Sequence, residues 1–382
     1  MFAVLLIAYF LFNIKILPKE KVAPYEWALL VFWFISLLTV FWSPNKFLTL
    51  ALNLVILLSF VTFFILRRAF SAGKSETVIK IIVWLGVLTS LFAFWQFVGD
   101  LAGWSQQITG LANLYVKNVF SFPRVQSTFF EPSFFANFLL VPLYLSTYLV
   151  IKNRKAWDFA TLVIIGTAFF LTLSRGGLIS LAVSLVFGMV LILKWHKKYQ
   201  KNILNVFISL IVAFLISIFA IYLGAGANGV ESYFGQAKNS TDVVSAEKSD
   251  EFNPTRGYTV RVALKNSLTH PFGVGTGVFG TLPEFTSVRE VAGNQRQTVN
   301  SIYPEILVET GFLGLIVFLV FIYLFLKDLI IRSKKSLLIT FLAVAAIAIF
   351  IQFLSFSTYY LLYIWVFLAF AMSILRLCVD QQ

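Results

Sequence analysis

The stretch FLTLALNLVILLSFVTFFIL, residues 47–66, contains no charged residue and is followed directly by Arg67 and Arg68. A helix of about 20 residues is about 30 Å long, which matches the hydrocarbon thickness of a lipid bilayer. Basic residues beside such a stretch mark the cytoplasmic surface of the membrane. Residues 47–66 therefore predict a transmembrane helix that ends on the cytoplasmic side.

The rest of the chain repeats this pattern. Hydrophobic residues make up 59% of the sequence and charged residues 12%, and the mean hydropathy is +0.87, which is typical of a membrane protein rather than a soluble domain. Further apolar runs occur at 2–17, 26–42, 79–99, 134–151, 157–173, 177–193, 203–223, 311–326, 336–354 and 357–375. We therefore predict an all-α, polytopic helical bundle with about 11 transmembrane helices.

The basic residues define the expected topology. They fall in every second connector: Lys19 and Lys21; Arg67, Arg68 and Lys74; Lys152, Arg154 and Lys155; Lys194, Lys197, Lys198 and Lys201; Lys327, Arg332, Lys334 and Lys335. By the positive-inside rule these connectors are cytoplasmic. This places the N-terminus outside and points to a missing preceding helix or a misassigned start site, because residues 1–17 read as a first helix rather than a signal peptide.

The remaining connectors lie outside, and the longest is residues 224–300. We expect three regions: a helical bundle at 1–223, an extracytoplasmic loop with amphipathic helices at 224–300, and a second part of the bundle at 301–382. The net charge of +13 is explained by topology signals and contacts with anionic lipid headgroups, so nucleic-acid binding is not expected. The single cysteine, Cys378, cannot form an internal disulfide bond.

The external connectors carry the polar motifs. In LTLSRGGLIS, residues 171–180, Arg175 stands between two apolar runs, directly before two glycines. Glycines let a backbone approach a ligand closely, and a guanidinium group matches phosphate oxygens, so Arg175 is a candidate phosphate-binding residue. The alternative is an interfacial arginine in a tight turn.

A second motif is FPRVQSTFFEPSFFANFLL, residues 122–140, where Arg124, Thr128 and Glu131 precede a helix that starts at Pro132. A carboxylate at a helix start gains from the helix dipole. Glu131 therefore has two interpretations, helix capping and catalytic chemistry.

The third motif is TRGYTVRVALKNSLTHPFGVGTGVFG, residues 255–280. It predicts an amphipathic helix over 258–268, with Arg256 and Arg261 in or beside it, and a glycine-rich turn after His270 and Pro271. The turn lacks the lysine of a nucleotide-binding loop and follows no strand, so a nucleotide site is disfavoured. His270 is expected to be a structural hydrogen-bonding residue, with general base as the alternative.

The fourth motif is NSIYPEILVETGFLGLIVFL, residues 300–319. Asn300 or Ser301 can cap a short helix on which Glu305 and Glu309 share one face. These carboxylates either bind something or belong to a juxtamembrane helix whose acids face water or pair with arginines. The two histidines, His196 and His270, and the external acids form no metal-binding pattern, so we expect no metal and no cofactor.

The order R-x-x-x-T-x-x-E-P-S, L-S-R-G-G, R-x8-H-P-x-G-x-G-x-G and N-S-x-Y-x-E-I-L-V-E-T-G-x-x-G resembles the O-antigen ligase and polymerase superfamily over roughly residues 120–320. The resemblance implies an integral membrane glycosyltransferase with a GT-C-like helical arrangement. It implies a donor glycan carried by undecaprenyl diphosphate, a glycan acceptor, contact with membrane lipids, a chain-length regulator as a further partner, and a site at the outer face of the bacterial inner membrane.

The resemblance also implies roles for single residues. Arg175 and Arg261 correspond to arginines that are thought to hold the diphosphate, and Arg256 assists. Asn300 stands where the family usually has a histidine associated with ligases, which favours the polymerase and exopolysaccharide branch. The expected catalytic residues are Arg175, Arg261, Glu131 and Asn300, and the expected substrate-binding residues are Arg256, Arg124, Thr128, His270, Tyr303, Glu305 and Glu309.

We therefore expect metal-independent, inverting glycosyl transfer, in which the arginines stabilise the leaving diphosphate. Glu131, Glu305 and Glu309 are candidate bases, with Glu131 first, because Asn300 can only orient a hydroxyl. A ligase that transfers glycan to a lipid A-core or protein acceptor is the alternative. A lipid-linked oligosaccharide flippase is disfavoured because its helices would need polar residues near the midplane.

Overall fold

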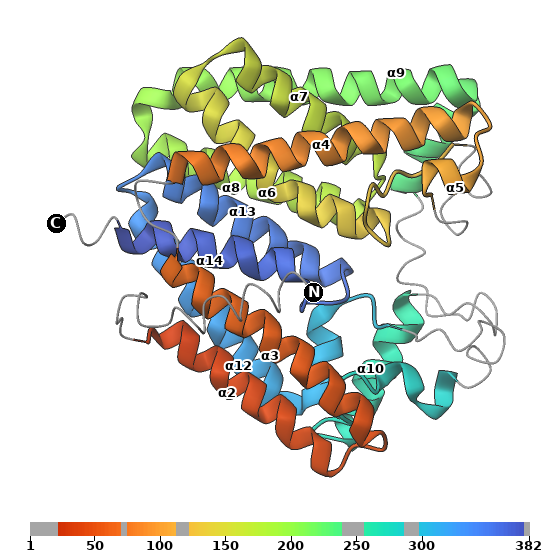
Figure 1. Ribbon diagram of the computed structural model, residues 1–382, viewed down its shortest axis with the longest axis vertical. Coiled ribbons are helices and arrows are strands. Elements are labelled where there is room, and N and C mark those ends of the chain that lie inside the picture. Colours follow the sequence, from red (N-terminus) through yellow and green to blue (C-terminus); the bar gives the residue numbers. More distant parts are fainter. Residues whose placement is uncertain (1–21, 70–74, 112–121, 239–255, 286–297, 378–382) are drawn as a thin grey trace. The chain divides into compact units, whose positions relative to one another are not determined.

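The computed structural model describes residues 22–69, 75–111, 122–238, 256–285 and 298–377, and this part of the chain is helical, without strands (Figure 1). Eight helices here are long and apolar enough to cross a membrane: Pro24–Phe41, Lys46–Ala69, Ser75–Leu101, Pro132–Asn153, Arg175–Trp195, Lys197–Phe234, Ile302–Ser333 and Leu337–Ser355. Two shorter apolar helices are Ala156–Leu171 and Leu362–Arg376. The predicted all-α, multi-pass architecture is confirmed, and the predicted crossing at 2–17 lies outside the described residues.

The chain divides into two compact units. Unit 1 contains α2 (Pro24–Leu38), α3 (Lys46–Ala69), α10 (Arg256–Thr269), most of α12 (Ile302–Ser333) and α14 (Leu362–Leu377). Unit 2 contains α4 (Ser75–Leu101), α5 (Gln106–Thr109), α6 (Pro132–Asn153), α7 (Ala156–Leu171), α8 (Arg175–Trp195), α9 (Gln200–Lys238) and α13 (Leu337–Gln352).

The core of unit 1 is aromatic. Phe32 of α2 packs against Phe318 of α12 with ring centroids 5.2 Å apart and against Tyr359 at 5.8 Å. On α3, Phe60 meets Trp365 of α14 edge to face at 4.6 Å. Because edge-to-face pairs add to the apolar area that they bury, these rings hold α2, α3, α12 and α14 together.

A buried ion pair joins the start of α2 to the end of α3. The carboxylate of Glu26 pairs with the guanidinium group of Arg67, and both side chains have 0% exposure. Arg67 also donates to the hydroxyl of Tyr25 over 3.3 Å. A buried charge is tolerated only with such a partner, so the pair fixes which end of α3 meets the start of α2.

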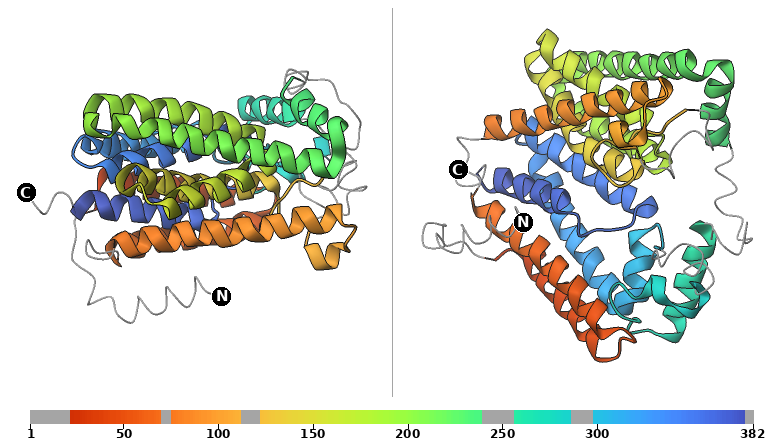
Figure 2. Two further views of the ribbon diagram at one scale, coloured as in Figure 1. Left: turned by 90° about the horizontal axis from the view of Figure 1, so that it is seen from above. Right: turned by 45° about the vertical axis from the view of Figure 1, so that its right-hand side comes forward.

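Close packing in unit 2 depends on small residues. A Cβ at Gly86 of α4 would lie 2.5 Å from the Pro142 side chain of α6, and one at Gly188 of α8 would lie 3.1 Å from Val344 of α13. Gly166 of α7 meets α9 in the same way, and the two helices run side by side in both views of Figure 2. Small residues are the usual means of close helix approach in membranes.

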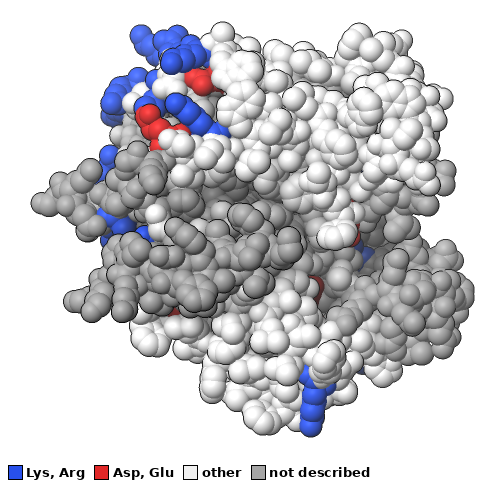
Figure 3. All heavy atoms as spheres, in the orientation of Figure 1, with Lys and Arg blue, Asp and Glu red and all other residues white. Residues whose placement is uncertain are grey.

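One end of unit 2 carries the basic clusters, which gather there in Figure 3. Lys152 at the end of α6 pairs with Glu76 at the start of α4, with 3.0 Å between Nζ and Oε1. Asn202 at the start of α9 donates to the carbonyl of Ile151 over 2.8 Å, and His196 lies 2.9 Å from the Ser333 carbonyl. The α6–α7, α8–α9 and α12–α13 turns therefore lie together, at what we call the basic end.

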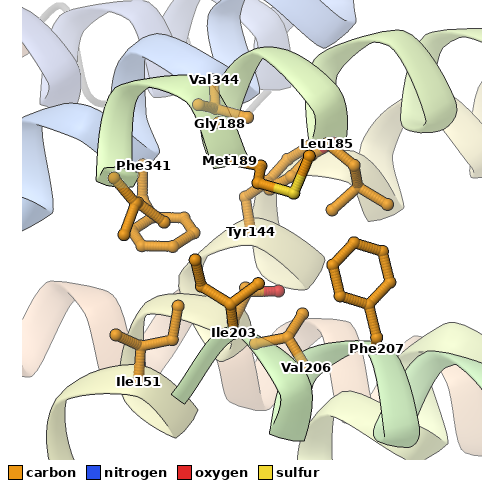
Figure 4. A pocket seen from close by; sticks show the side chains of 12 residues that line it. Tyr144, Ile151, Leu185, Gly188, Met189, Ile203, Val206, Phe207, Phe341 and Val344 are labelled. Carbon is orange, nitrogen blue, oxygen red and sulfur yellow. The ribbon is translucent and has the colours of Figure 1, made fainter. Parts of the chain in front are cut away.

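A small apolar cavity of about 30 Å³ lies among α6, α8, α9 and α13 (Figure 4). Tyr144, Leu185, Met189 and Phe207 are among the side chains around it. Because its walls are apolar and its volume is that of a few water-sized probes, the cavity is unsuited to a sugar or a phosphate.

Two helices continue beyond the predicted boundaries. The predicted span at 203–223 is followed by a kink at Gly226, after which α9 runs on to Lys238. The continuation returns along the same helix, because Tyr233 and Phe234 both pack against Phe214, at 6.2 and 6.4 Å. The predicted span at 311–326 belongs to α12, which begins at Ile302 and has a non-helical residue at Gly311.

Candidate active site

The candidate residues fall into two groups, one in each unit, and those of unit 2 depend on Gln96. This fully buried residue of α4 accepts a hydrogen bond from the backbone N–H of Ser127 over 2.7 Å and donates to its carbonyl over 2.9 Å. Ser127 has a φ of 53°, which is uncommon for a residue with a side chain. Gln96 therefore holds the irregular segment 122–131 in a conformation that its local sequence does not favour.

The guanidinium group of Arg124 donates hydrogen bonds to the turn between α7 and α8. Its Nε donates to the carbonyl of Thr172 over 3.1 Å, and Nη2 donates to the carbonyl of Leu173 over 3.4 Å. Leu173 has a φ of 53°, so its carbonyl needs a partner outside a regular helix. Arg124 thus positions the turn at Leu173, which lies two residues before Arg175.

Arg175 is the first residue of α8 and is exposed. The side chain of Ser174 caps this helix by accepting a hydrogen bond from the N–H of Gly177 over 3.3 Å. A helix start presents free N–H groups and a partial positive charge, so a guanidinium group there adds to a site that already favours anions. This combination suits a phosphate group.

Glu131 and Thr128 complete the group in unit 2. Glu131 occupies the N-cap position of α6, but its side chain makes no capping hydrogen bond to the backbone. Its carboxylate accepts a hydrogen bond from Ser133 Oγ over 2.9 Å and is half-buried, while Thr128 is exposed. Glu131 is therefore held in place without being used as a helix cap.

In unit 1, the glycine-rich loop after α10 packs against the break in α12. The N–H groups of Val274 and Gly275 donate to the carbonyls of Val308 and Glu309 over 2.9 and 3.1 Å, and the Phe312 N–H donates to the carbonyl of Pro271 over 3.1 Å. Gly273 and Gly311 both have positive φ, and a Cβ on either would lie 2.3 Å from a backbone oxygen of the other segment. These two glycines thus allow the close pairing of the two backbone segments.

The α2–α3 turn holds the other side of this loop. Trp42 Nε1 donates to the carbonyl of Gly273 over 2.8 Å, and the hydroxyl groups of Ser36 and Thr276 lie 2.7 Å apart. Thr276 N–H donates to Thr39 Oγ1 over 3.3 Å. The Gly273 carbonyl, the Thr276 N–H and the Thr276 hydroxyl thereby find partners at the end of these helices, as backbone groups away from water require.

Glu305 and Glu309 lie on the first segment of α12 and are 8% and 5% exposed. The Oε2 atom of Glu305 is buried and has no hydrogen-bond partner within the described part of the chain. Tyr359 lies within electrostatic range of both carboxylates, and burial, followed by the Glu309 charge, raises the pKa of Tyr359 well above its usual value. The tyrosine therefore remains a neutral phenol beside the two acids.

No third His, Cys, Asp or Glu joins these two acids as a metal site would need, as far as the described residues extend. The nearby candidate Tyr303 is half-buried, and its ring contacts Phe353 with centroids 6.5 Å apart. The alternative in which Glu305 and Glu309 face water does not apply, because both side chains are buried.

Three candidate side chains of α10 and its end are exposed: Arg256, Arg261 and His270. Arg261 makes no hydrogen bond or ion pair with any residue that the structure describes. Lys265, one helical turn further on, is exposed as well. The helix buries Thr259, Val262, Ala263 and Ser267 on its other face, so this stripe of cations is left accessible.

Asn300 stands just before the start of α12 with a φ of 57°. Its side chain bonds locally to Thr298, over 3.3 Å to the hydroxyl group and 3.4 Å to the carbonyl. Asn and His are both among the few residues enriched at positive φ, so the backbone itself restricts which residues suit this position.

Sequence reasoning missed Gln96, Trp42 and Tyr359. Gln96 is a lone polar residue within an apolar span, and Trp42 looks like any interfacial aromatic residue. The function of each side chain depends on a partner that is distant in the sequence, 31 residues away for Gln96 and 231 for Trp42. A local sequence pattern does not reveal such a partner.

Comparison with protein families finds that residues 160–319 match the family described as O-Antigen ligase. The predicted resemblance to the O-antigen ligase and polymerase superfamily is confirmed, although the match does not distinguish polymerase from ligase. It covers both Arg175 and Arg261. Comparison with curated proteins finds no match.

Proposed function

We propose that this member of the O-antigen ligase and polymerase superfamily polymerises oligosaccharide repeat units carried on undecaprenyl diphosphate. A role in membrane glycosyl transfer for polysaccharide assembly follows from the family match. The finer proposal rests on one observation: Arg175 and Arg261 are both exposed and both lie within the matched region, each in a segment that carries one of the motifs. The site would face the periplasm from the bacterial inner membrane.

The chemistry is an inverting displacement. An acceptor hydroxyl oxygen attacks the anomeric carbon, the bond from that carbon to the diphosphate oxygen breaks, and the diphosphate leaves with the electron pair. In this proposal a fixed guanidinium group, that of Arg175 or that of Arg261, stabilises the growing charge on the leaving group, as fixed donors do without reorganisation. The helix start at Arg175 adds the partial positive charge of its N–H groups.

The acceptor proton needs a base. Glu131 fits best because its carboxylate is half-buried and held by Ser133, whereas Glu305 and Glu309 are buried. The Glu131→Gln variant keeps an acceptor for Ser133 but cannot take a proton. We expect it to lower kcat by about 100-fold with little change in the KM for donor, as loss of a general base does. A normal kcat would remove Glu131 from this role.

The main test uses purified protein, reconstituted with a lipid-linked repeat unit, and separates the products by gel electrophoresis. A ladder of products supports the polymerase, and a single shifted band on a lipid or protein acceptor supports the ligase that the family description names. Translocation of the lipid-linked unit without glycosyl transfer would contradict both enzymes.

The same assay examines the arginines. Arg175→Ala is expected to lower the rate of polymer formation by about 100-fold or more, because one fixed donor to the leaving group is lost. Arg175→Lys should recover part of the rate, since it keeps the charge but not the planar fork. Lys155→Ala, which removes an exposed cation at the basic end, serves as the matched control. Equal rates for Arg175→Ala and the control would overturn the proposed diphosphate site.

A further inference from the structure

An open hollow of about 520 Å³ lies in unit 1 where α10 ends beside the α2–α3 turn. Its volume is within the roughly 300–1,000 Å³ that is usual for small-molecule sites. The residues around it are Trp42, Thr269, His270, Pro271, Phe272 and Gly273. Two aromatic rings and one imidazole therefore surround a space large enough for sugar rings.

The aromatic rings are held in place although they are exposed. Trp42 is 49% exposed, yet its indole N–H is bonded to the Gly273 carbonyl over 2.8 Å. Phe272 is 65% exposed, and the backbone around it is fixed by the bond from Phe312 N–H to the Pro271 carbonyl. An interfacial anchor needs its indole N–H for water and headgroups, so the internal bond of Trp42 favours a binding surface over an anchor.

His270 contributes a hydrogen-bond acceptor. Its Nδ1 lies 3.2 Å from the carbonyl of Asn266 and 3.0 Å from Thr269 Oγ1. A carbonyl only accepts, and the Thr269 hydroxyl already donates to the same carbonyl, so Nδ1 carries the proton in the neutral ring. The Nε2 atom is then an acceptor, and it bonds to nothing in the part of the chain that the structure describes.

We infer that this hollow is a glycan-binding subsite, in which a sugar ring stacks on Trp42 and Phe272 while one hydroxyl donates to His270 Nε2. Sugars combine apolar ring faces with hydroxyl donors, which is the combination that these three side chains match. The hollow begins at Thr269, eight residues after Arg261, which is about 12 Å along a helix. The inference rests on the proposed function, because it places a glycan chain beside the diphosphate-binding arginine.

The test measures binding directly. Full-length protein in lipid nanodiscs is titrated with soluble glycan extracted from the organism that carries the gene, and binding is followed by saturation-transfer NMR. Phe272→Ala is expected to weaken binding roughly 10-fold through loss of one aromatic contact. His270→Ala should weaken it about 5-fold through loss of one hydrogen bond. Phe272→Tyr keeps the ring and should bind like the parent protein.

Phe47→Ala is the matched control, because Phe47 is an aromatic residue of α3 with 84% exposure and lies outside the hollow. Equal binding by Phe272→Ala and the parent, or an equal loss in Phe47→Ala, would show that these rings only contact lipid headgroups and would overturn the subsite. Polymerisation is measured in parallel. If Phe272→Ala weakens glycan binding but the parent protein forms no polymer, the proposed function is refuted and the subsite is not. If the parent protein forms polymer but Phe272→Ala binds glycan as well as the parent, the subsite is refuted and the proposed function is not.

Discussion

The segment 122–131 of unit 2 and the loop 271–277 of unit 1 meet the same requirement by different means. Both contain irregular backbone at the end of apolar helices, where every N–H and C=O group needs a partner. In unit 2 the partner of the Ser127 N–H and C=O groups is a side chain, that of Gln96. In unit 1 the partners are the backbone of broken α12 and the α2–α3 turn. Unit 2 should thus be sensitive to removal of a side chain and unit 1 to addition of one.

The largest effect is expected from Gly273→Ala in unit 1. The added Cβ would lie 2.3 Å from the Glu309 carbonyl oxygen, at a φ of 84°. Both the clash and the backbone strain oppose folding, so we expect a loss of roughly 3 kcal/mol or more in the free energy of unfolding. The unfolding midpoint in detergent measures this.

Gly103→Ala separates the clash from the strain. Gly103 has a φ of 76°, but no atom lies within 4 Å of its added Cβ. We expect a loss of about 1 kcal/mol, from the left-handed backbone alone. If the two variants were equally destabilised, the close backbone pairing of unit 1 would not be the reason for its glycines.

An intermediate effect is expected from Gln96→Leu in unit 2. This change keeps the side-chain volume but leaves the buried N–H and C=O groups of Ser127 without the side chain that they bond to. Leaving buried polar groups unpaired costs about 1–3 kcal/mol each, so we expect a loss of about 2 kcal/mol or more. Gln107→Leu, at an exposed position of α5, is the control and should be nearly neutral. A neutral Gln96→Leu would mean that segment 122–131 holds its own conformation.

The smallest effect is expected at Asn300, which is in unit 1 but has a side chain at positive φ. Asn300→Ala should cost about 1 kcal/mol because alanine tolerates the left-handed region poorly. Asn300→Gly and Asn300→His should fold as well as the parent, since both residues accept this backbone. Unfolding midpoints for the three variants measure the difference. A stable Asn300→Ala would show that the backbone does not select the residue at this position.

The helices could be predicted from sequence because hydropathy is a local property. The predicted runs at 47–66 and 134–151 correspond to α3 and α6 within a few residues. The predicted end of the span at 223 lies close to the kink at Gly226, after which α9 continues to Lys238 and places Tyr233 and Phe234 against Phe214. Those contacts join residues far apart in the sequence.

The candidate site was predictable in its residue types but not in their surroundings. The motifs directed attention to Arg175 and Arg261, both of which are exposed. They could not show that Arg124 bonds to the carbonyls of Thr172 and Leu173, or that Glu305 and Glu309 are buried. Burial and partner distance depend on how helices pack, which spacing along one helix does not reveal.

The ion pair between Glu26 and Arg67 has a consequence for how the chain enters the bilayer. Neither charge is exposed in the folded unit, so each helix inserted alone would carry an unmatched charge at its end. Such a charge disfavours insertion by up to about 3 kcal/mol near the bilayer centre and by less towards the surface. We therefore expect α2 and α3 to leave the insertion machinery as a helical hairpin, with the ion pair formed before either helix meets lipid alone.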